Sequence, residues 1–135
     1  MKLTPKQRAI LRMKFDGKCA YCGCELPEKG WHADHVEPIL RISTQDMNAA
    51  EKGLWKLKNT GESHHPHLDN LENIFPACQP CNLLKSTYSV EMFRKQISLQ
   101  VERGRKSSMN FRTAERFGLI KTTDNPVVFW FERYQ

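Results

Sequence analysis

The sequence lacks any apolar run near the roughly 18 residues that a membrane-spanning helix requires. It also lacks an internal repeat, a low-complexity tract and, at its beginning, the apolar stretch of a secretory signal. These absences predict an intracellular protein that does not enter a membrane. With 135 residues, of which 39% are hydrophobic and 27% charged, the chain suits one compact domain and is neither a disordered tail nor a fibre.

Cysteine is scarce but informative, because the five cysteines are an odd number in a chain without a signal peptide. A reducing cytosol keeps thiols free, which argues against a disulfide framework. Four of them form two Cys-x-x-Cys pairs, Cys19 with Cys22 and Cys78 with Cys81. Two such pairs complete a tetrahedral set of thiolates, so the pattern predicts a closed, structural zinc site. Redox-active thiols and unrelated buried cysteines are the alternatives, and Cys24 is expected not to be a ligand.

The net charge of +6 is concentrated in one part of the chain. Residues 85–121 carry nine basic and three acidic side chains, whereas residues 1–84 are nearly neutral. Such a concentration suits a polyanionic partner, although a solvated helix face is the alternative. The side chains expected to contact nucleic acid are Lys85, Arg94, Arg105, Lys106 and Arg112.

Local patterns predict an α+β fold. A capping box at Thr4 begins a helix that ends near Gly17, and short strands are expected within residues 31–38 and around 74–75. A helix should follow Cys81, and Ser89 should cap a helix that Gly104 ends. We also expect a helix over residues 110–117 and a C-terminal strand over residues 127–131. Residues 41–69 show no clear pattern.

Polar residues between and after the cysteine pairs form an ordered set. Asp34-His35 follows the first pair, Asn73 precedes the second by five residues, and Asn82 and Lys85 follow it. This combination, over residues 19 to about 88, resembles the HNH endonuclease family. Residues 109–135 are also similar to the C-terminal extension of small phage-encoded HNH proteins.

The resemblance implies a single HNH domain over residues 1–135, with its core at 17–88 and a basic helical extension at 89–135. The core would be a ββα-metal unit stabilised by the zinc knuckle. In this unit Asp34 and Asn82 would ligate a catalytic Mg²⁺ or Mn²⁺, His35 would be the general base and Asn73 would brace the loop. The family usually has histidine where this chain has Asn82.

The chemistry of these residues agrees with those roles. A neutral imidazole with a pKa near ~6.5 can accept a proton from water at neutral pH. Two oxygen donors with one negative charge between them form the kind of weak, open site that Mg²⁺ or Mn²⁺ uses. Adjacent residues of an ideal strand point to opposite faces, however, so Asp34 and His35 can serve one site only near a bend or a strand end.

These observations favour a metal-dependent DNA endonuclease, cutting one strand or both, in the cytoplasm of a bacterial or phage-infected cell. The alternative is a zinc-stabilised regulator that binds nucleic acid or protein and carries a silent nuclease site. A structural subunit with zinc alone is a third reading. His32 is expected beside Asp34 or at the surface, and the cluster His64, His65 and His67 has no assigned role.

Overall fold

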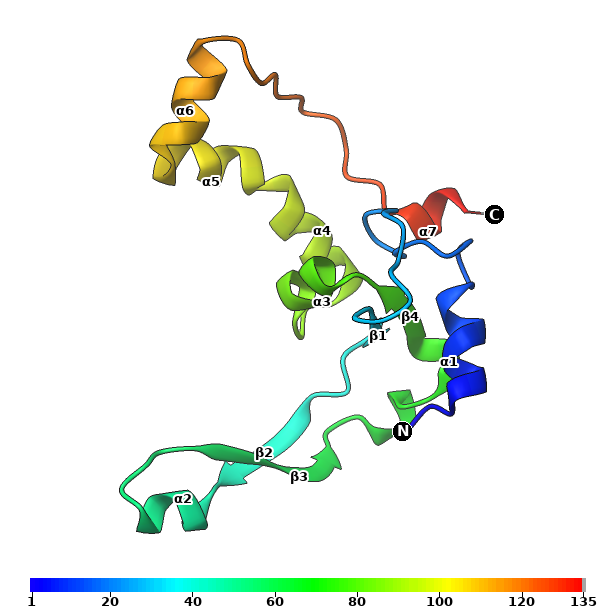
Figure 1. Cartoon of the computed structure of the whole chain (residues 1–135). Coiled ribbons are helices and arrows are strands. Elements are labelled where there is room, and N and C mark those ends of the chain that lie inside the picture. Colours follow the sequence, from blue (N-terminus) through cyan, green and yellow to red (C-terminus); the bar gives the residue numbers. More distant parts are fainter. Residues whose placement is uncertain (135) are drawn as a thin grey trace.

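The computed structural model describes residues 1–134, which form short helices and two separate two-stranded antiparallel sheets (Figure 1). The expected α+β class is thereby confirmed. The helices are α1 (Pro5–Arg12), α2 (Met47–Glu51), α3 (Gln79–Lys85), α4 (Val90–Ser98), α5 (Gln100–Ser107), α6 (Met109–Arg116) and α7 (Trp130–Arg133). The strands are β1 (His32–His35), β2 (Arg41–Gln45), β3 (Leu57–Ser63) and β4 (Ile74–Ala77). No helix within residues 1–134 is both long and apolar enough to cross a bilayer.

Helix α1 begins as its sequence predicts. The Thr4 hydroxyl accepts a hydrogen bond from the Gln7 amide at 3.1 Å, and the Gln7 side chain accepts one from the Thr4 amide at 2.9 Å. Pro5 occupies the first turn, where its missing N–H leaves no helical hydrogen bond unmade. Leu11 on this helix is buried in the core.

The sheet that carries the candidate site joins two strands far apart in the sequence. Strand β1 pairs antiparallel with β4, so that Asp34 lies opposite Phe75 and His35 opposite Ile74. Helix α3 follows β4 directly, with Pro80 in its first turn. Both strands and this helix were expected from the sequence, and together they place Asp34 against α3.

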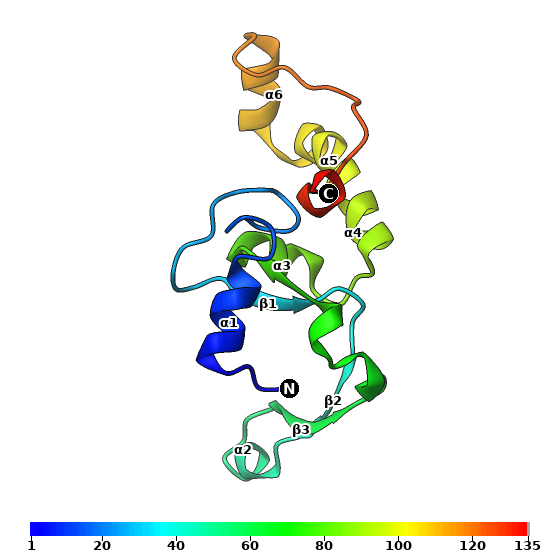
Figure 2. The same ribbon diagram turned by 90° about the vertical axis from the view of Figure 1, so that its right-hand side faces the viewer.

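Residues 41–63, which lie in the segment without a clear sequence pattern, form a hairpin that we call the β2–β3 arm. Strand β2 pairs with β3, and α2 lies between them with Asp46 as its N-cap. The arm extends away from the β1–β4 sheet (Figures 1 and 2). Residues 51–62 are all exposed. Strand β3 therefore has almost no buried face, and the alternation of apolar and polar residues that predicts a strand is missing.

The hydrophobic core lies around the cysteine pairs and is rich in aromatic side chains. The rings of Phe93 and Phe129 stack at 5.3 Å, and Tyr21 contacts both of them edge to face. Cys19 and Cys78 are themselves buried in this core. The core therefore joins the first cysteine pair, β4, α4 and the C-terminal segment.

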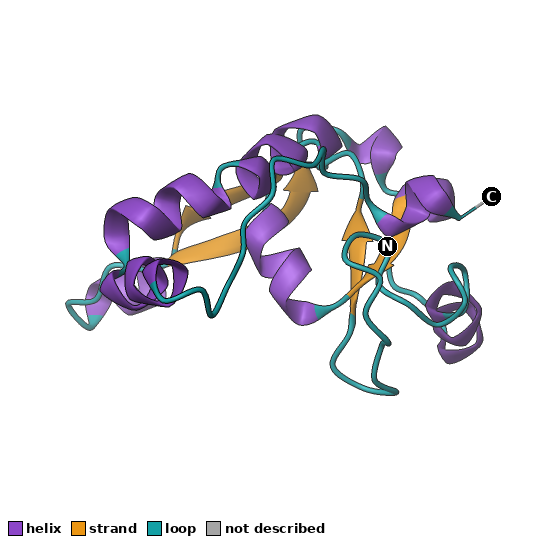
Figure 3. Cartoon of the chain, turned by 90° about the horizontal axis from the view of Figure 1, so that it is seen from above, coloured by secondary structure: helices purple, strands orange, loops and turns teal. Residues whose placement is uncertain are grey.

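The C-terminal helices depart from prediction at Gly104, which does not end a helix. It lies inside α5, and a Cβ atom there would come within 2.9 Å of Cδ2 of Phe111 on α6. The glycine thus allows α6 to pack closely on α5, and Ser108 caps α6 one residue after α5 ends. Helices α4 to α6 form a second arm, which we call the helical arm, on the same side of the core as the β2–β3 arm (Figures 1 and 3).

The predicted strand over residues 127–131 is wrong. Phe129 is extended and buried, but helix α7 begins at the next residue. The amides of Trp130 and Phe131 donate to the carbonyls of Tyr21 and Ala20 at 3.0 and 2.8 Å. The tail therefore closes over the first cysteine pair instead of extending a sheet.

Candidate functional site

The four cysteines of the two Cys-x-x-Cys pairs come together. Their Sγ atoms all lie within 4.8 Å of one another, and those of Cys22 and Cys78 are 3.7 Å apart. Tetrahedral zinc with Zn–S bonds of ~2.3 Å separates its sulfur ligands by about 3.8 Å. The cluster of Cys19, Cys22, Cys78 and Cys81 can therefore hold a metal ion such as zinc. We call it the knuckle.

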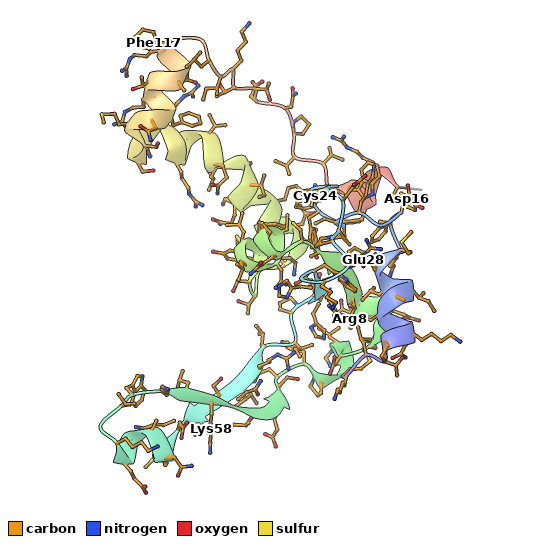
Figure 4. All side chains as sticks on the ribbon, viewed as in Figure 1. Arg8, Asp16, Cys24, Glu28, Lys58 and Phe117 are labelled. Atoms are coloured by element: carbon orange, nitrogen blue, oxygen red, sulfur yellow. The ribbon has the colours of Figure 1, made fainter. Side chains whose placement is uncertain are left out.

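The close thiols of the knuckle shift one another's pKa values in opposite directions, with that of Cys19 lowered and those of Cys78 and Cys81 raised. A hydrogen bond from Cys81 lowers the pKa of the Cys19 thiol to about 4, so that one thiolate is favoured even before an ion binds. Cys24 lies beside the knuckle but outside the group (Figure 4). Its Sγ is not among the four that lie within 4.8 Å of one another, which fits its expected exclusion from the ligand set.

Asp34 on β1 is only 5% exposed and is connected to the knuckle by Tyr21. The Tyr21 hydroxyl donates to Oδ2 of Asp34 at 2.5 Å, and Lys85 Nζ lies 3.2 Å from the same oxygen. Burial raises the pKa of Asp34, and Lys85 and Tyr21 act in the opposite direction. Burial also raises the pKa of Tyr21, so its hydroxyl remains a donor.

Lys85 does not lie where a phosphate contact requires it. It is fully buried, and besides Asp34 its ammonium group donates to the carbonyl oxygen of His35 at 2.9 Å. A lysine without exposed surface cannot meet a nucleic-acid backbone, so this part of the predicted interface is wrong. The physical reason is local, because a buried carboxylate requires a cation and α3 supplies it.

Replacing Lys85 by methionine should lower the free energy of unfolding by about 3–5 kcal/mol at neutral pH, because Asp34 would be left buried and unpaired. Burial already raises the pKa of Asp34 in the folded protein. A raised pKa favours folding at low pH, so the deficit should shrink as pH falls through the folded-state pKa. Urea denaturation of the zinc-loaded variant and the wild type at each pH measures the difference.

The matched control is the double variant Lys85→Met with Asp34→Asn, which removes the unpaired charge. It should recover part of the lost stability. The double-mutant cycle should therefore give a favourable interaction energy between Lys85 and Asp34 in the wild type. A Lys85→Met variant as stable as the wild type at neutral pH would show that the pair does not hold α3 on β1.

His35 has a partner that sequence reasoning missed. Its Nε2 lies 2.8 Å from Oδ1 of Asp69, and Asp69 also pairs with the amino group of Met1. The amino group of Met1, and to a smaller extent His35, lower the pKa of Asp69. Asp69 stands 34 positions from His35 in the segment that had no readable pattern, and no motif marks it.

Asn73 joins two segments of the loop between β1 and β4. Its side-chain amide donates to the carbonyls of Glu37 and Leu68, both at 2.8 Å, and its Oδ1 accepts from the Glu37 amide at 2.9 Å. Leu68 directly precedes Asp69, so these bonds hold the His35 partner near the end of β1. This geometry is what the bracing role predicted for Asn73 requires.

Asn82 lies on α3 one turn before Lys85, and its side chain makes no hydrogen bond within the described residues 1–134. The side chains of Asp34 and His35 have different partners, in keeping with adjacent positions on a strand. No hydrogen bond or ion pair in the described chain joins either of them to Asn82. The predicted catalytic residues thus lie on the β1–β4 sheet, on the loop before β4 and on α3.

Most of the basic side chains that were predicted to contact nucleic acid from the helical arm make contacts within the protein. Arg94 binds Glu91, Glu132 and the Val127 carbonyl. Arg112 donates to the carbonyls at the end of α5, and Arg105 pairs with Glu115. Lys106, whose side chain is 75% exposed, pairs only with the exposed Glu102 on the same helix, at 3.2 Å. Arg94 and Arg112 therefore hold the arm together, and phosphate contact is left to Lys106 and part of Arg105.

The remaining histidines form no second metal site in residues 1–134. The rings of His65 and His67 contact each other edge to face at 5.9 Å. The knuckle is the only group of metal-binding side chains found in this described part of the chain. His32 pairs through its backbone with Ala77 on β4.

Comparison of the chain with protein-family models, with curated proteins and with solved structures gives no match. Function is therefore inferred from the residues of this chain and their geometry.

Proposed function

We propose that the chain is a metal-dependent endonuclease of the HNH type that hydrolyses phosphodiester bonds in DNA. The observation that carries this proposal is the hydrogen bond between His35 Nε2 and Asp69 at the end of β1, one residue after Asp34. The Asp69 carboxylate follows a loop that Asn73 braces, an arrangement that suits the orientation of a histidine base. The knuckle and Tyr21 fix the strand and the helix around this point.

The Asp69 contact defines which nitrogen of His35 can act as a base. A carboxylate that accepts the Nε2–H proton leaves the lone pair on Nδ1. Nδ1 can then take a proton from water as the water oxygen attacks phosphorus. The bond from phosphorus to the 3′ oxygen breaks, and the products carry a 3′-hydroxyl and a 5′-phosphate.

Asp34 and Asn82 are the residues that would hold the catalytic ion. Bound Mg²⁺ or Mn²⁺ would neutralise charge on the phosphate and the departing oxygen. Both contacts of the Asp34 carboxylate are made by Oδ2, which leaves Oδ1 as a potential ligand. Because Lys85 compensates the charge of Asp34, we expect weak binding that depends on substrate phosphate oxygens.

A phosphodiester bound at the end of β1 would lie next to both Asp34 and His35. His35 is the last residue of the strand, and Val36 donates to the Asn73 carbonyl where the loop begins. The proposal requires the substrate to reach both side chains at this end, because Asp34 is buried and points to the opposite strand face from His35.

The second candidate function is a zinc-stabilised binding protein without nuclease activity. It is favoured by the ion pair of Asp34 with the fully buried Lys85, since an aspartate neutralised in this way can serve the fold alone. This reading gives no role to the Asp69 contact of His35 or to the unpartnered side chain of Asn82. We therefore place it second.

Supercoiled plasmid incubated with the zinc-loaded chain tests the proposal. Nicked or linear DNA should accumulate when Mg²⁺ or Mn²⁺ is added and should not form without either ion, because the knuckle has no open ligand position. Equal cutting without an added ion would contradict the metal requirement. Binding of DNA with no cutting under either ion would favour the second candidate.

A further inference from the structure

The end of the β2–β3 arm exposes an aromatic residue without a partner. The side chain of Trp55 is 73% exposed, and Leu54, Leu57 and Met47 beside it are also exposed. The other two tryptophans are covered, with Trp31 in the core and Trp130 packed over the knuckle. An exposed tryptophan contributes little apolar burial to the fold. The position of Trp55 in an exposed apolar group therefore requires another explanation.

The same end of the arm is basic. Lys52, Lys56 and Lys58 are exposed, and residues 52–58 contain no acidic side chain. None of these three lysines makes an ion pair within the described residues 1–134, whereas Arg94 and Arg105 of the helical arm pair with glutamates. Glu51, which directly precedes this segment, is also exposed. An apolar, aromatic tip with three unpaired lysines beside it complements a polyanion that also presents apolar base edges.

The form and position of the arm point to the same partner. The arm is a two-stranded ribbon that pairs with no other strand, and a ribbon of this kind fits the major groove of duplex DNA. Its two strands lead directly to the candidate site, because β2 follows His35 by six residues and β3 precedes Asp69 by six. Whatever occupies the site therefore passes the base of the arm.

We propose that residues 52–58 form a nucleic-acid contact in which Trp55 packs against base edges in the major groove of duplex DNA while Lys56 and Lys58 meet the backbone. This inference rests on the proposed nuclease function, since it names where the substrate continues beyond the cleavage site. Strand β3 has seven residues and spans about 20 Å, so the tip would contact DNA well beyond the scissile phosphate.

Binding of a labelled DNA duplex by the full, zinc-loaded chain tests this contact. The measurements use the His35→Ala background, so that the DNA remains intact, and record anisotropy over a range of salt concentrations. Trp55→Ala should weaken binding roughly tenfold without changing the salt dependence, because an apolar contact with base edges releases no counterions. Lys58→Ala should instead lower the slope of log K against log salt by about one.

Two matched variants separate the loss of the aromatic contact at Trp55 from a general effect of removing an exposed aromatic side chain. Trp55→Phe keeps an aromatic face and should recover most of the affinity lost in Trp55→Ala. Phe117→Ala removes an aromatic side chain that is 75% exposed on the other arm, at the opposite end of the molecule from Lys58 (Figure 4), and should bind as the background does. Tryptophan emission should be quenched by DNA in the background and much less in Trp55→Phe.

The outcomes are distinct. Unchanged affinity and unchanged quenching in the Trp55 variants, with DNA still bound, would overturn the inference and leave the nuclease proposal intact. No DNA binding by the wild-type chain would overturn both. A change of Trp55 emission on anionic lipid vesicles, with DNA affinity unaffected by the variants, would assign the tip to a membrane surface and overturn the nucleic-acid contact.

Discussion

Cys78→Ser is expected to unfold the core of the protein, as is removal of zinc by a strong chelator. Cys19 and Cys78 lie in the hydrophobic core, and the knuckle is the junction of the first cysteine pair, β4 and α3. Binding of structural zinc contributes about 10–16 kcal/mol in small zinc domains, which equals or exceeds the total stability of about 5–15 kcal/mol of a typical domain. Circular dichroism and zinc content, followed during chelation, measure the effect.

The matched control for this prediction is Cys24→Ser. The Cys24 thiol lies outside the ligand group, so the variant should keep one zinc per chain and a melting temperature close to that of the wild type. A Cys78→Ser variant that folds and melts like Cys24→Ser would show that the knuckle does not depend on a metal ion.

Asp69→Asn is expected to lower the single-turnover rate of DNA cleavage by roughly a hundredfold to ten-thousandfold. An amide can donate to Nε2 of His35, which would leave the proton on Nδ1, the atom proposed to accept a proton from water. In the wild type the lowered pKa of Asp69 keeps the carboxylate ionised at neutral pH, so it can hold the required tautomer. Rapid-quench measurement of labelled product gives the rate.

DNA affinity and zinc content should be unchanged in the same Asp69→Asn protein, because Asp69 lies on the surface loop and not in the core. A rate within a factor of about two of the wild type, when the general-base contribution is expected to be far larger, would remove Asp69 and its tautomer effect from the proposed mechanism.

Much of the fold was predictable because short-range rules decide it. The capping box at Thr4 and the cap at Ser89 are both present, since each satisfies amides that a helix start leaves unpaired. The matched spacing of the two cysteine pairs predicted their meeting across more than fifty residues. In these places local chemistry and the final packing agree, which is why the pattern sufficed.

Three features were not predictable because they depend on partners distant in the sequence. Lys85 pairs with Asp34 across the β1–α3 contact, and Asp69 contacts His35 across the intervening β2–β3 arm. Gly104 resembles a helix end but serves the approach of Phe111. A glycine that ends a helix and a glycine that allows close packing have the same local sequence pattern. The same is true of a lysine that contacts phosphate and a lysine that pairs with a buried carboxylate.

The C-terminal segment shows how packing overrides propensity. Residues 127–131 are rich in β-forming side chains, yet no strand edge lies beside them in the described chain. Phe129 enters the core, and Glu132 accepts from the Phe129 amide at 3.0 Å and so begins α7. The hydrophobic residues were correctly expected to pack over the core, but the hydrogen bonds available there favour a helical turn.

The central claim is that His35 activates water for cleavage of a phosphodiester bond when a hard divalent ion is present. Single-turnover cleavage of one labelled duplex by wild-type and His35→Ala proteins, each carrying one zinc per chain, measures this directly. We predict product formation by the wild type with Mg²⁺ or Mn²⁺ and a rate at least a hundredfold lower for the variant. Equal rates for the two proteins, or no cleavage by the wild type under either ion, would contradict it.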